Sequence, residues 1–243
     1  MIKKLAIVAL LLALCCYFVV AVTVWRKPSG AVVCNGVEVT VEGSPHAGFI
    51  DGREVRRLLV ASKCDPQGEQ MDDISLMVIE KALLKNPYIE EVACHKTPGG
   101  KVCVRVRQRS PILHVMAADG GDYYLDETGK KMPKSQYFAD LVVATGHITP
   151  QYARANLTML GRCIKADPFW NNQIQQIYVT SKGEVELVPR VGNHVVLLGQ
   201  PVGVEQKLQR LRDFYTKGLN KVGWNKYSAV SLKYDNQIIC TKK

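Results

Sequence analysis

The stretch Lys101–Arg109, KVCVRVRQR, alternates valine with basic or polar residues. An alternation with period two indicates a β-strand that buries one face and exposes the other. The segment Thr97-Pro98-Gly99-Gly100 comes directly before it, and the apolar positions Ile89, Val92 and Cys94 come before that. Because Pro and Gly favour a tight turn, the whole segment is predicted to form a β-hairpin.

One strand and two helices are predicted ahead of the hairpin. Residues 37–41, VEVTV, again alternate valine with polar residues. A helix is expected from Asp51, as its cap, to about Ser62, and a second, capped by Asp72 or Asp73, to about Lys85. The order is strand, helix, helix, strand, strand. The helices must cover the apolar face of the sheet, which would otherwise leave its valine row in water.

The N-terminal segment Leu5–Val24 has twenty residues without a charge, Pro or Gly. As a helix it would be roughly 30 Å long, which matches the hydrocarbon core of a bilayer. A cleaved signal peptide is the alternative, but its apolar run would be about 7–15 residues and would end at a small-residue cleavage site. We therefore predict an uncleaved transmembrane helix at 5–24, a cytoplasmic tail at 1–4, and a linker at 25–36. The bulk of the chain is expected outside the membrane.

Beyond Pro111 the pattern becomes mostly strands, with two helices at about Pro150–Ile164 and Val204–Leu219. The predicted strands are Ile112–Met116, Tyr123–Asp126, Leu141–Thr145, Ile174–Thr180, Glu184–Pro189, His194–Leu198, Ser228–Tyr234 and Gln237–Thr241. The last two meet at the turn-prone pair Asp235-Asn236. The predicted fold class is α+β, with one unit at 37–110 and a β-rich domain at 111–243.

The cysteines and histidines show no catalytic or metal-binding pattern. The eight cysteines contain no C-x-x-C, and none of the five histidines lies within four residues of another. Strand parity places Cys94 on the buried face and Cys103 on the wet face of the hairpin, so these two are predicted not to form a disulfide. No catalytic residue, metal or cofactor is expected.

The net charge of +10 is spread evenly along the chain. A solvated surface explains it best. A basic face near anionic lipid is the alternative, whereas nucleic acid fits poorly with an exported domain that has no binding motif.

Several local motifs resemble the FtsQ/DivIB family of bitopic bacterial division proteins, whose first exported unit is a POTRA domain. They are Asn86-Pro87-Tyr88-Ile89, the strand KVCVRV, Gln108-Arg109-Ser110-Pro111, and Tyr123-Tyr124-Leu125-Asp126 with Gly129. Phe169-Trp170 and the ending around Leu232-Lys233-Tyr234 look like the Bacteroidetes branch. The resemblance covers essentially the whole chain, although many family members have a longer cytoplasmic tail.

The resemblance implies a non-enzymatic scaffold in the inner membrane at the division septum. It would recruit the partners FtsB and FtsL, help to regulate septal peptidoglycan synthesis, and contact other division proteins through the POTRA domain. FtsB would add a strand to the last strand of the β domain. The matched residues are Lys233, Tyr234, Asp235, Asn236, Gln237, Ile238 and Ile239. An exposed edge strand binds a partner through main-chain hydrogen bonds, although Lys242 and Lys243 could instead simply blunt the edge.

Two other functions are kept open. A membrane-anchored cell-envelope enzyme, such as a peptidoglycan hydrolase, would carry a site that no motif reveals. A POTRA-bearing transport or assembly component would more typically carry several such units or a membrane barrel. No small-molecule substrate or nucleic acid is expected for the scaffold.

Overall fold

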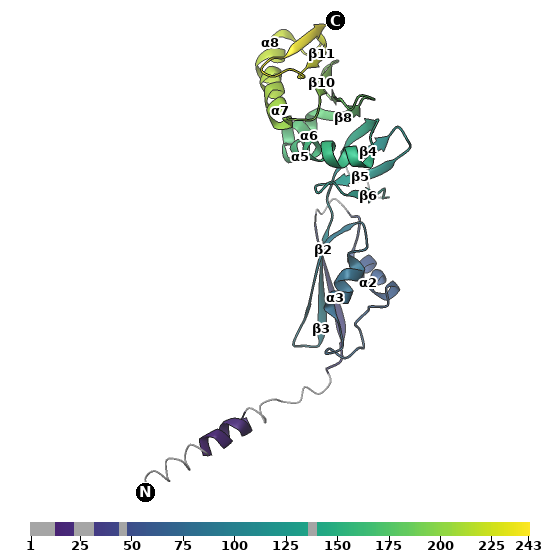
Figure 1. Cartoon of the computed structure of the whole chain (residues 1–243), viewed down its shortest axis with the longest axis vertical. Coiled ribbons are helices and arrows are strands. Elements are labelled where there is room, and N and C mark those ends of the chain that lie inside the picture. The colour runs from purple at the N-terminus through teal and green to yellow at the C-terminus, as the bar shows by residue number, and fades with distance from the viewer. Residues whose placement is uncertain (1–12, 22–31, 44–47, 136–139) are drawn as a thin grey trace, which may run out of the picture.

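The structure is a computed structural model that describes residues 13–21, 32–43, 48–135 and 140–243. Figure 1 shows two units, each with its own sheet, that follow one another along the chain. Of the predicted span Leu5–Val24, residues 13–21 are helical, and the rest lie outside the described residues. In the part of the chain that the structure describes, no helix combines the length and the apolar character needed to cross a bilayer.

The first unit has the predicted order of one strand, two helices and a hairpin. Its elements are β1 (Gly36–Glu42), α2 (Gly52–Ala61), α3 (Leu76–Leu83), β2 (Ile89–Lys96) and β3 (Lys101–Gln108). The sheet order is β1-β3-β2, in which β3 pairs parallel with β1 and antiparallel with β2. The alternating stretch that begins at Lys101 is therefore the central strand, which explains why its valines are fully covered.

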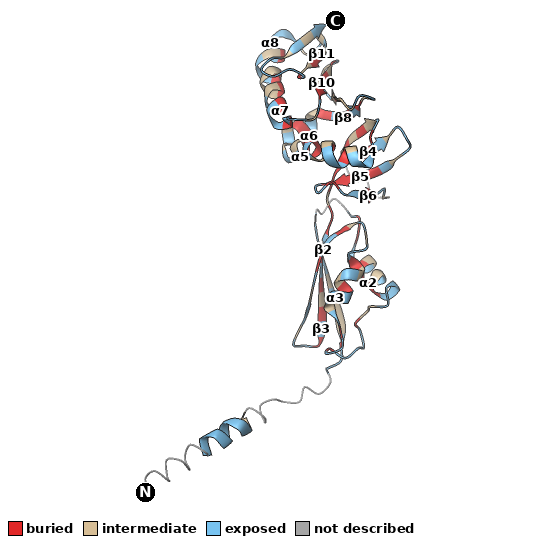
Figure 2. Ribbon diagram, in the orientation of Figure 1, coloured by how far each residue is buried: buried red, intermediate tan, exposed pale blue. Residues whose placement is uncertain are grey.

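The two helices cover one face of this sheet, as predicted. Val104 of β3 is 1% exposed, and Val55 of α2 and Leu83 of α3 belong to the same apolar core. Asp51 caps α2, since its Oδ1 accepts a hydrogen bond from the amide of Glu54 at 2.7 Å. Figure 2 shows the buried residues gathered where the helices meet the sheet.

The predicted cap of the second helix is wrong. The helix α3 begins after Ser75, and neither Asp72 nor Asp73 caps it. Gln70 forms a β-bridge with Val33, and the amide of Asp73 donates to the carbonyl of Gln70, so the chain is still in a turn at that point. A tertiary contact with the strand entry therefore delays the start of the helix.

The hairpin cysteines point as strand parity predicted. Cys94 lies opposite Val104 and packs on the core, while Cys103 lies opposite His95 on the other face. The Cys103 thiol instead donates to a carboxylate oxygen of Glu38 at 3.7 Å. Both thiols are free.

The second unit contains a nine-stranded mixed sheet in the order β12-β11-β10-β9-β8-β7-β4-β5-β6. Its strands are β4 (Pro111–Ala117), β5 (Asp122–Asp126), β6 (Lys131–Pro133), β7 (Val142–Gly146), β8 (Ile174–Val179), β9 (Val185–Pro189), β10 (Val195–Gly199), β11 (Tyr227–Ser231) and β12 (Ile239–Lys242). The short β6 was not predicted, because three residues are too few to show an alternation.

Two long helical segments join these strands, close to the predicted ranges. The first consists of α4 (Pro150–Tyr152), the π-helical stretch η1 (Ala153–Leu157) and α5 (Thr158–Ala166). The second consists of α7 (Val204–Asp213), the π-helical stretch η2 (Phe214–Leu219) and α8 (Asn220–Val222). A short helix, α6 (Pro168–Gln173), was missed, although Asp167 caps it through the amide of Phe169 at 3.0 Å.

The units meet at a joint that combines an ion pair with an aromatic cluster. The Arg109 guanidinium lies 2.5 Å from the Asp126 carboxylate, with the side chains 9% and 2% exposed. Beside this pair, Phe49 stacks on Tyr88 with ring centroids 5.6 Å apart. Phe49 also meets Tyr124 edge-on at 5.7 Å. Since these residues come from both units, the joint couples the two sheets.

Candidate functional site

The strand β12 lies at one end of the nine-stranded sheet, where it pairs with β11 alone among the described strands. The opposite end is different. There Met132 of β6 is fully buried in the joint, and β6 ends at Pro133, which has no amide donor. The free pairing edge of this sheet is therefore at β12, beside the C-terminus. Figure 2 shows this strand as mostly exposed.

The amides along β12 alternate between the inner and the outer side. The amide of Lys243 donates inward, to the carbonyl of Lys226. Because successive main-chain groups of a strand point to opposite sides, those of Cys240 and Lys242 face outward. The Lys242 carbonyl, however, accepts from the Ser228 hydroxyl at 3.4 Å. The open edge thus offers the N–H and C=O of Cys240 and the N–H of Lys242 to an added strand.

The side chains of β12 also alternate between the two faces of the sheet. Cys240 lies opposite Val230 and packs against the core. Ile239 and Thr241 lie on the other face, and the Ile239 side chain is 46% exposed. A partner strand would therefore meet an exposed aliphatic residue on the face that the helices leave uncovered.

The predicted partner-binding residues fall mostly in the connection between β11 and β12. Ile239 begins β12, whereas residues 233–238 form the turn that precedes it. The predicted strands Ser228–Tyr234 and Gln237–Thr241 are thus too long at their shared end. The paired part of β11 stops at Ser231, and Leu232 makes one last bond, from its amide to the carbonyl of Leu197.

Two contacts and one left-handed residue fix this turn. The Lys233 ammonium lies 2.6 Å from the Glu184 carboxylate, and this contact is the main reason why the pKa of Glu184 lies below its ordinary value. Arg210 of α7 donates to the carbonyl of Tyr234 at 2.9 Å. Asn236 takes a left-handed φ of 61°, which Asn tolerates better than most residues. The Tyr234 side chain is left 55% exposed beside the open edge.

Sequence reasoning missed Cys240, Thr241 and Lys242 as part of the site. These three residues complete β12, and two of them carry the outward main-chain groups. The predicted strand includes Cys240 and Thr241, but the predicted binding residues end at Ile239, and Lys242 enters only the alternative in which it blunts the edge together with Lys243.

The exposed face of the sheet continues inward from Ile239. Across the paired strands, Ile239 lies opposite Ser231, which lies opposite Leu197. Leu197 lies opposite Glu186 and, further along, Tyr178 is 37% exposed. A partner that adds a strand to β12 could therefore extend its contact over a partly apolar sheet face.

No metal centre is visible in residues 13–21, 32–43, 48–135 and 140–243, where no three His, Cys, Asp or Glu side chains gather closely enough to bind an ion. The partly buried His114 lies 2.6 Å from the Asp122 carboxylate, which is also paired with Lys134 at 2.7 Å. These contacts, that with Lys134 first, hold the pKa of Asp122 below its ordinary value, so the carboxylate is a stable ion-pair partner.

Comparison with known families gives two matches that together cover both units. The family described as FtsQ/DivIB, C-terminal related, matches residues 110–241, and the POTRA-like domain matches residues 32–107. The comparison with curated proteins finds no significant match. The first match spans the nine-stranded sheet from β4 to β12, and the second spans the three-stranded sheet.

Proposed function

This chain belongs to the FtsQ/DivIB family, and from that premise we propose that it recruits FtsB and FtsL to the division septum. The family is one of non-enzymatic cell-division scaffolds, and the POTRA-like unit agrees with that membership. In this proposal Leu5–Val24 anchors the chain in the inner membrane with its N-terminus in the cytoplasm. The two exported units then bind partners that help to regulate septal peptidoglycan synthesis.

The observation that carries the proposal is the open edge of β12. Main-chain hydrogen bonds give affinity in strand addition, and alternate side chains give specificity. Cys240 offers its N–H and C=O outward and Lys242 offers its N–H, which makes three main-chain groups by strand alternation. At about 0.5–1.5 kcal/mol net for each bond formed, they supply a useful but limited share of the binding free energy.

Exposed side chains around the edge supply the rest. Tyr234 is 55% exposed and Ile239 is 46% exposed, and aromatic side chains commonly anchor interfaces. Lys242 adds a positive charge that favours an acidic partner residue and speeds encounter. Lys233 is already paired with Glu184, so its contribution to a partner is to position the turn.

A matched pair of substitutions tests strand addition. Lys242→Pro removes the outward amide, while Lys242→Ala removes the same charge and keeps the amide. We expect Lys242→Pro to bind the FtsB ectodomain about 3–10-fold more weakly than Lys242→Ala, which corresponds to one lost hydrogen bond. Proline is tolerated at this position because the amide that it lacks faces away from β11 and makes no bond within the sheet. Binding is measured by biolayer interferometry on the chain in detergent micelles.

Equal affinities of the two variants would remove strand addition at β12. A chain that ends at Tyr234 gives a second measurement. It lacks β12 altogether and should no longer bind the FtsB ectodomain. Retained binding there would move the FtsB site elsewhere on the chain. Cleavage of purified peptidoglycan by the chain would instead favour a cell-envelope hydrolase.

A further inference from the structure

Among the described strands, β1 pairs with β3 alone, and this edge of the first unit is regular, in contrast to the other edge of the same sheet. Its seven residues pair with β3 in continuous register from Gly36 to Glu42, without a bulge. It contains no Lys or Pro, the residues with which proteins commonly block an edge. A regular, unblocked edge of this length is a template for another strand.

The second edge of the sheet is covered. On β2 the outward amide of Cys94 donates to the Glu80 carboxylate of α3 at 2.9 Å. The Lys96 ammonium donates to the carbonyl of Met71, which fixes the end of the same strand. The register of β2 also shifts between Ile89 and Glu91. Within the described residues, the fold thus protects β2 and puts no comparable contact on β1.

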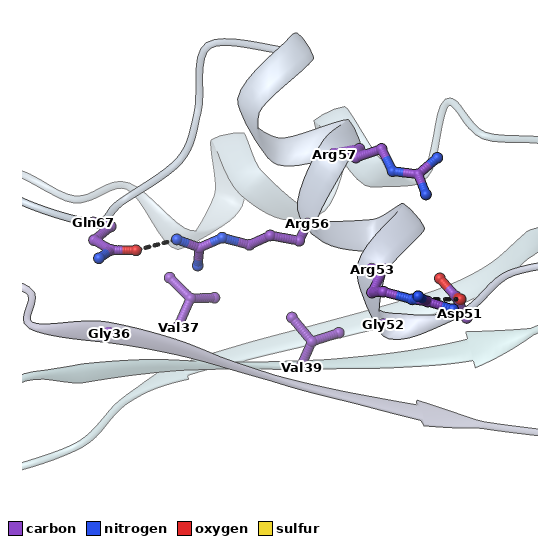
Figure 3. Close-up of a pocket in the computed structure, with 9 residues that line it drawn as sticks. All are labelled: Gly36, Val37, Val39, Asp51, Gly52, Arg53, Arg56, Arg57 and Gln67. Atoms are coloured by element: carbon purple, nitrogen blue, oxygen red, sulfur yellow. Dashed lines mark hydrogen bonds and ion pairs between the residues drawn. The ribbon is translucent and has the colours of Figure 1, made fainter.

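A groove of about 780 Å³ runs between β1 and α2. Val37 and Val39 point from β1 into it, and Arg56 extends from α2 above them, as Figure 3 shows. The valines are only partly buried, although they pack at the border of the core. The groove follows β1 from Gly36 to Val39, which is about 13 Å at 3.3 Å per residue.

The wall of the groove is basic. Arg53, Arg56 and Arg57 line it together with one carboxylate, that of Asp51, so the lining residues carry a net charge of +2. The side chains of Arg53 and Arg57 are 86% and 73% exposed. Their ion pairs within the chain are single surface contacts, which are worth little and are easily exchanged for a partner's carboxylate.

The negative residues of β1 itself do not oppose such a partner. Glu38 and Glu42 alternate with Val37, Val39 and Val41, so they lie on the face away from the groove. Glu38 is 2.6 Å from Lys101, and Glu42 is 3.2 Å from Arg105. Both carboxylates are therefore paired across the sheet.

We propose that the β1–α2 groove binds an extended, acidic segment of a partner protein, which adds a strand to β1. The apolar side chains of that segment would pack on Val37 and Val39. Its carboxylates would pair with the exposed Arg53 and Arg57, whereas Arg56 is held by Asp65, at 3.4 Å, and by Gln67. This surface is distinct from the β12 edge, which lies in the other unit, and its test does not depend on FtsB.

The test uses a synthetic probe with the chemistry of the proposed segment. Fluorescein-labelled acetyl-Val-Ser-Glu-Ser-Val-Ser-Glu-amide has one residue for each residue of β1 and, as a strand, places its valines and glutamates together on one face, and its counterpart has Lys in place of Glu. Fluorescence anisotropy on the full chain in detergent micelles should show binding of the acidic peptide only. N-methylation of alternate amides along one edge of this peptide should abolish binding, while N-methylation along the other edge should preserve it.

Charge-reversal variants locate the site without touching the sheet. The double variant Arg53→Glu/Arg57→Glu should lower the affinity for the acidic peptide at least about tenfold, because two attractive contacts become repulsive. Lys81→Glu is the matched control, since Lys81 is an exposed cation on α3. It should change the affinity less than about twofold.

Three results would overturn the proposal. Equal binding of the acidic and basic peptides would exclude charge selection. Equal binding of both N-methylated forms would exclude strand addition. A chain that forms dimers by light scattering, and that loses them with Arg53→Glu/Arg57→Glu, would assign the groove to a second copy of the chain.

Discussion

The buried ion pair between Arg109 and Asp126 should be the most sensitive point of the joint. Replacing Asp126 by Ala removes the carboxylate 2.5 Å from Arg109, and it also removes the acceptor for the amides of Thr128 and Lys130, at 2.8 and 2.6 Å. Arg109 still donates to the carbonyls of Pro87 and Ile89, at 3.1 and 2.9 Å. Its positive charge, however, would then be buried without a counter-ion.

Breaking a buried pair by removing one partner costs about 3–5 kcal/mol. A domain has a total stability of about 5–15 kcal/mol, so the effect is large. Asp122→Ala is the control, because Asp122 makes ion pairs with His114 and Lys134 at a partly exposed site. Surface pairs contribute about 0–1 kcal/mol each.

The free energy of unfolding is measured with urea at pH 7 on a fragment that spans residues 32–243, followed by circular dichroism. We expect Asp126→Ala to lose about 3–5 kcal/mol and Asp122→Ala to lose about 1 kcal/mol or less. Hydrogen exchange should show faster opening around Tyr88 and Tyr124 in Asp126→Ala alone. If the two variants differ by less than about 1 kcal/mol, the ion pair does not hold the joint.

The pH dependence gives an independent check. Burial raises the pKa of Asp126, but hydrogen bonds from Arg109, Lys130 and Thr128 outweigh it, so the pKa lies below its ordinary value. A depressed folded-state pKa stabilises the fold above the unfolded pKa of about 3.9, and this stabilisation is lost as the pH falls through the folded value. The difference in the free energy of unfolding between the parent chain and Asp126→Ala should therefore become smaller below about pH 4.

Three further predictions concern single positions. His194 is bonded to the Tyr215 hydroxyl at 2.8 Å, and burial, with a smaller effect of Lys243, lowers its pKa. The free energy of unfolding should therefore fall as the pH drops below about 6.5. Urea unfolding of His194→Gln should show a smaller change in this free energy between pH 7 and 5. Gly146→Ala should lower the free energy of unfolding by more than about 3 kcal/mol, because a Cβ there would lie 2.2 Å from the carbonyl oxygen of Val179 at a φ of +100°. Gly120→Ala is the control, since it has open space at a φ of +89°, and it should cost about 1 kcal/mol. Both values are measured by thermal unfolding. Burial, with a smaller effect of Glu80, raises the pKa of the Cys94 thiol to about 12. Iodoacetamide at pH 8 should therefore label Cys103 well before Cys94. Equal labelling of the two, measured by mass spectrometry, would contradict the burial of Cys94.

Period-two alternation predicted the strands of the first unit, and caps with helical spacing predicted its helices. The valines of Lys101–Arg109 identified the strand, and the parity argument placed Cys94 and Cys103 on opposite faces, as the structure has them. The pattern could not reveal that this strand is the central one, because strand order depends on pairing between segments far apart in the chain. It also gave no sign that Gln70 would pair with Val33 and delay α3.

The last two strands show where sequence reasoning ends. Residues 228–241 contain enough Val, Ile and Tyr to be interpreted as strand up to the turn at Asp235-Asn236. The actual strand ends are set by two contacts. Lys233 pairs with Glu184, which directly precedes β9, and the carbonyl of Tyr234 accepts from Arg210 of α7. No local pattern encodes these contacts, so the predicted binding residues were centred on the turn instead of the strand.

The four edges of the two sheets are treated in different ways, and this difference is the basis of both binding proposals. On β2 an acceptor from Glu80 occupies an outward amide, and β6 is buried in the joint and ends at Pro133. The remaining edges, β1 and β12, have no such device among the described residues, apart from the shortness of β12 and its terminal lysines. Unprotected edges invite association, so proteins tend to keep them only where a partner completes the sheet. Each edge lies in a different unit, and the Arg109–Asp126 joint connects those units. A partner that binds at one edge is therefore held in a defined position relative to a partner at the other, as a scaffold requires.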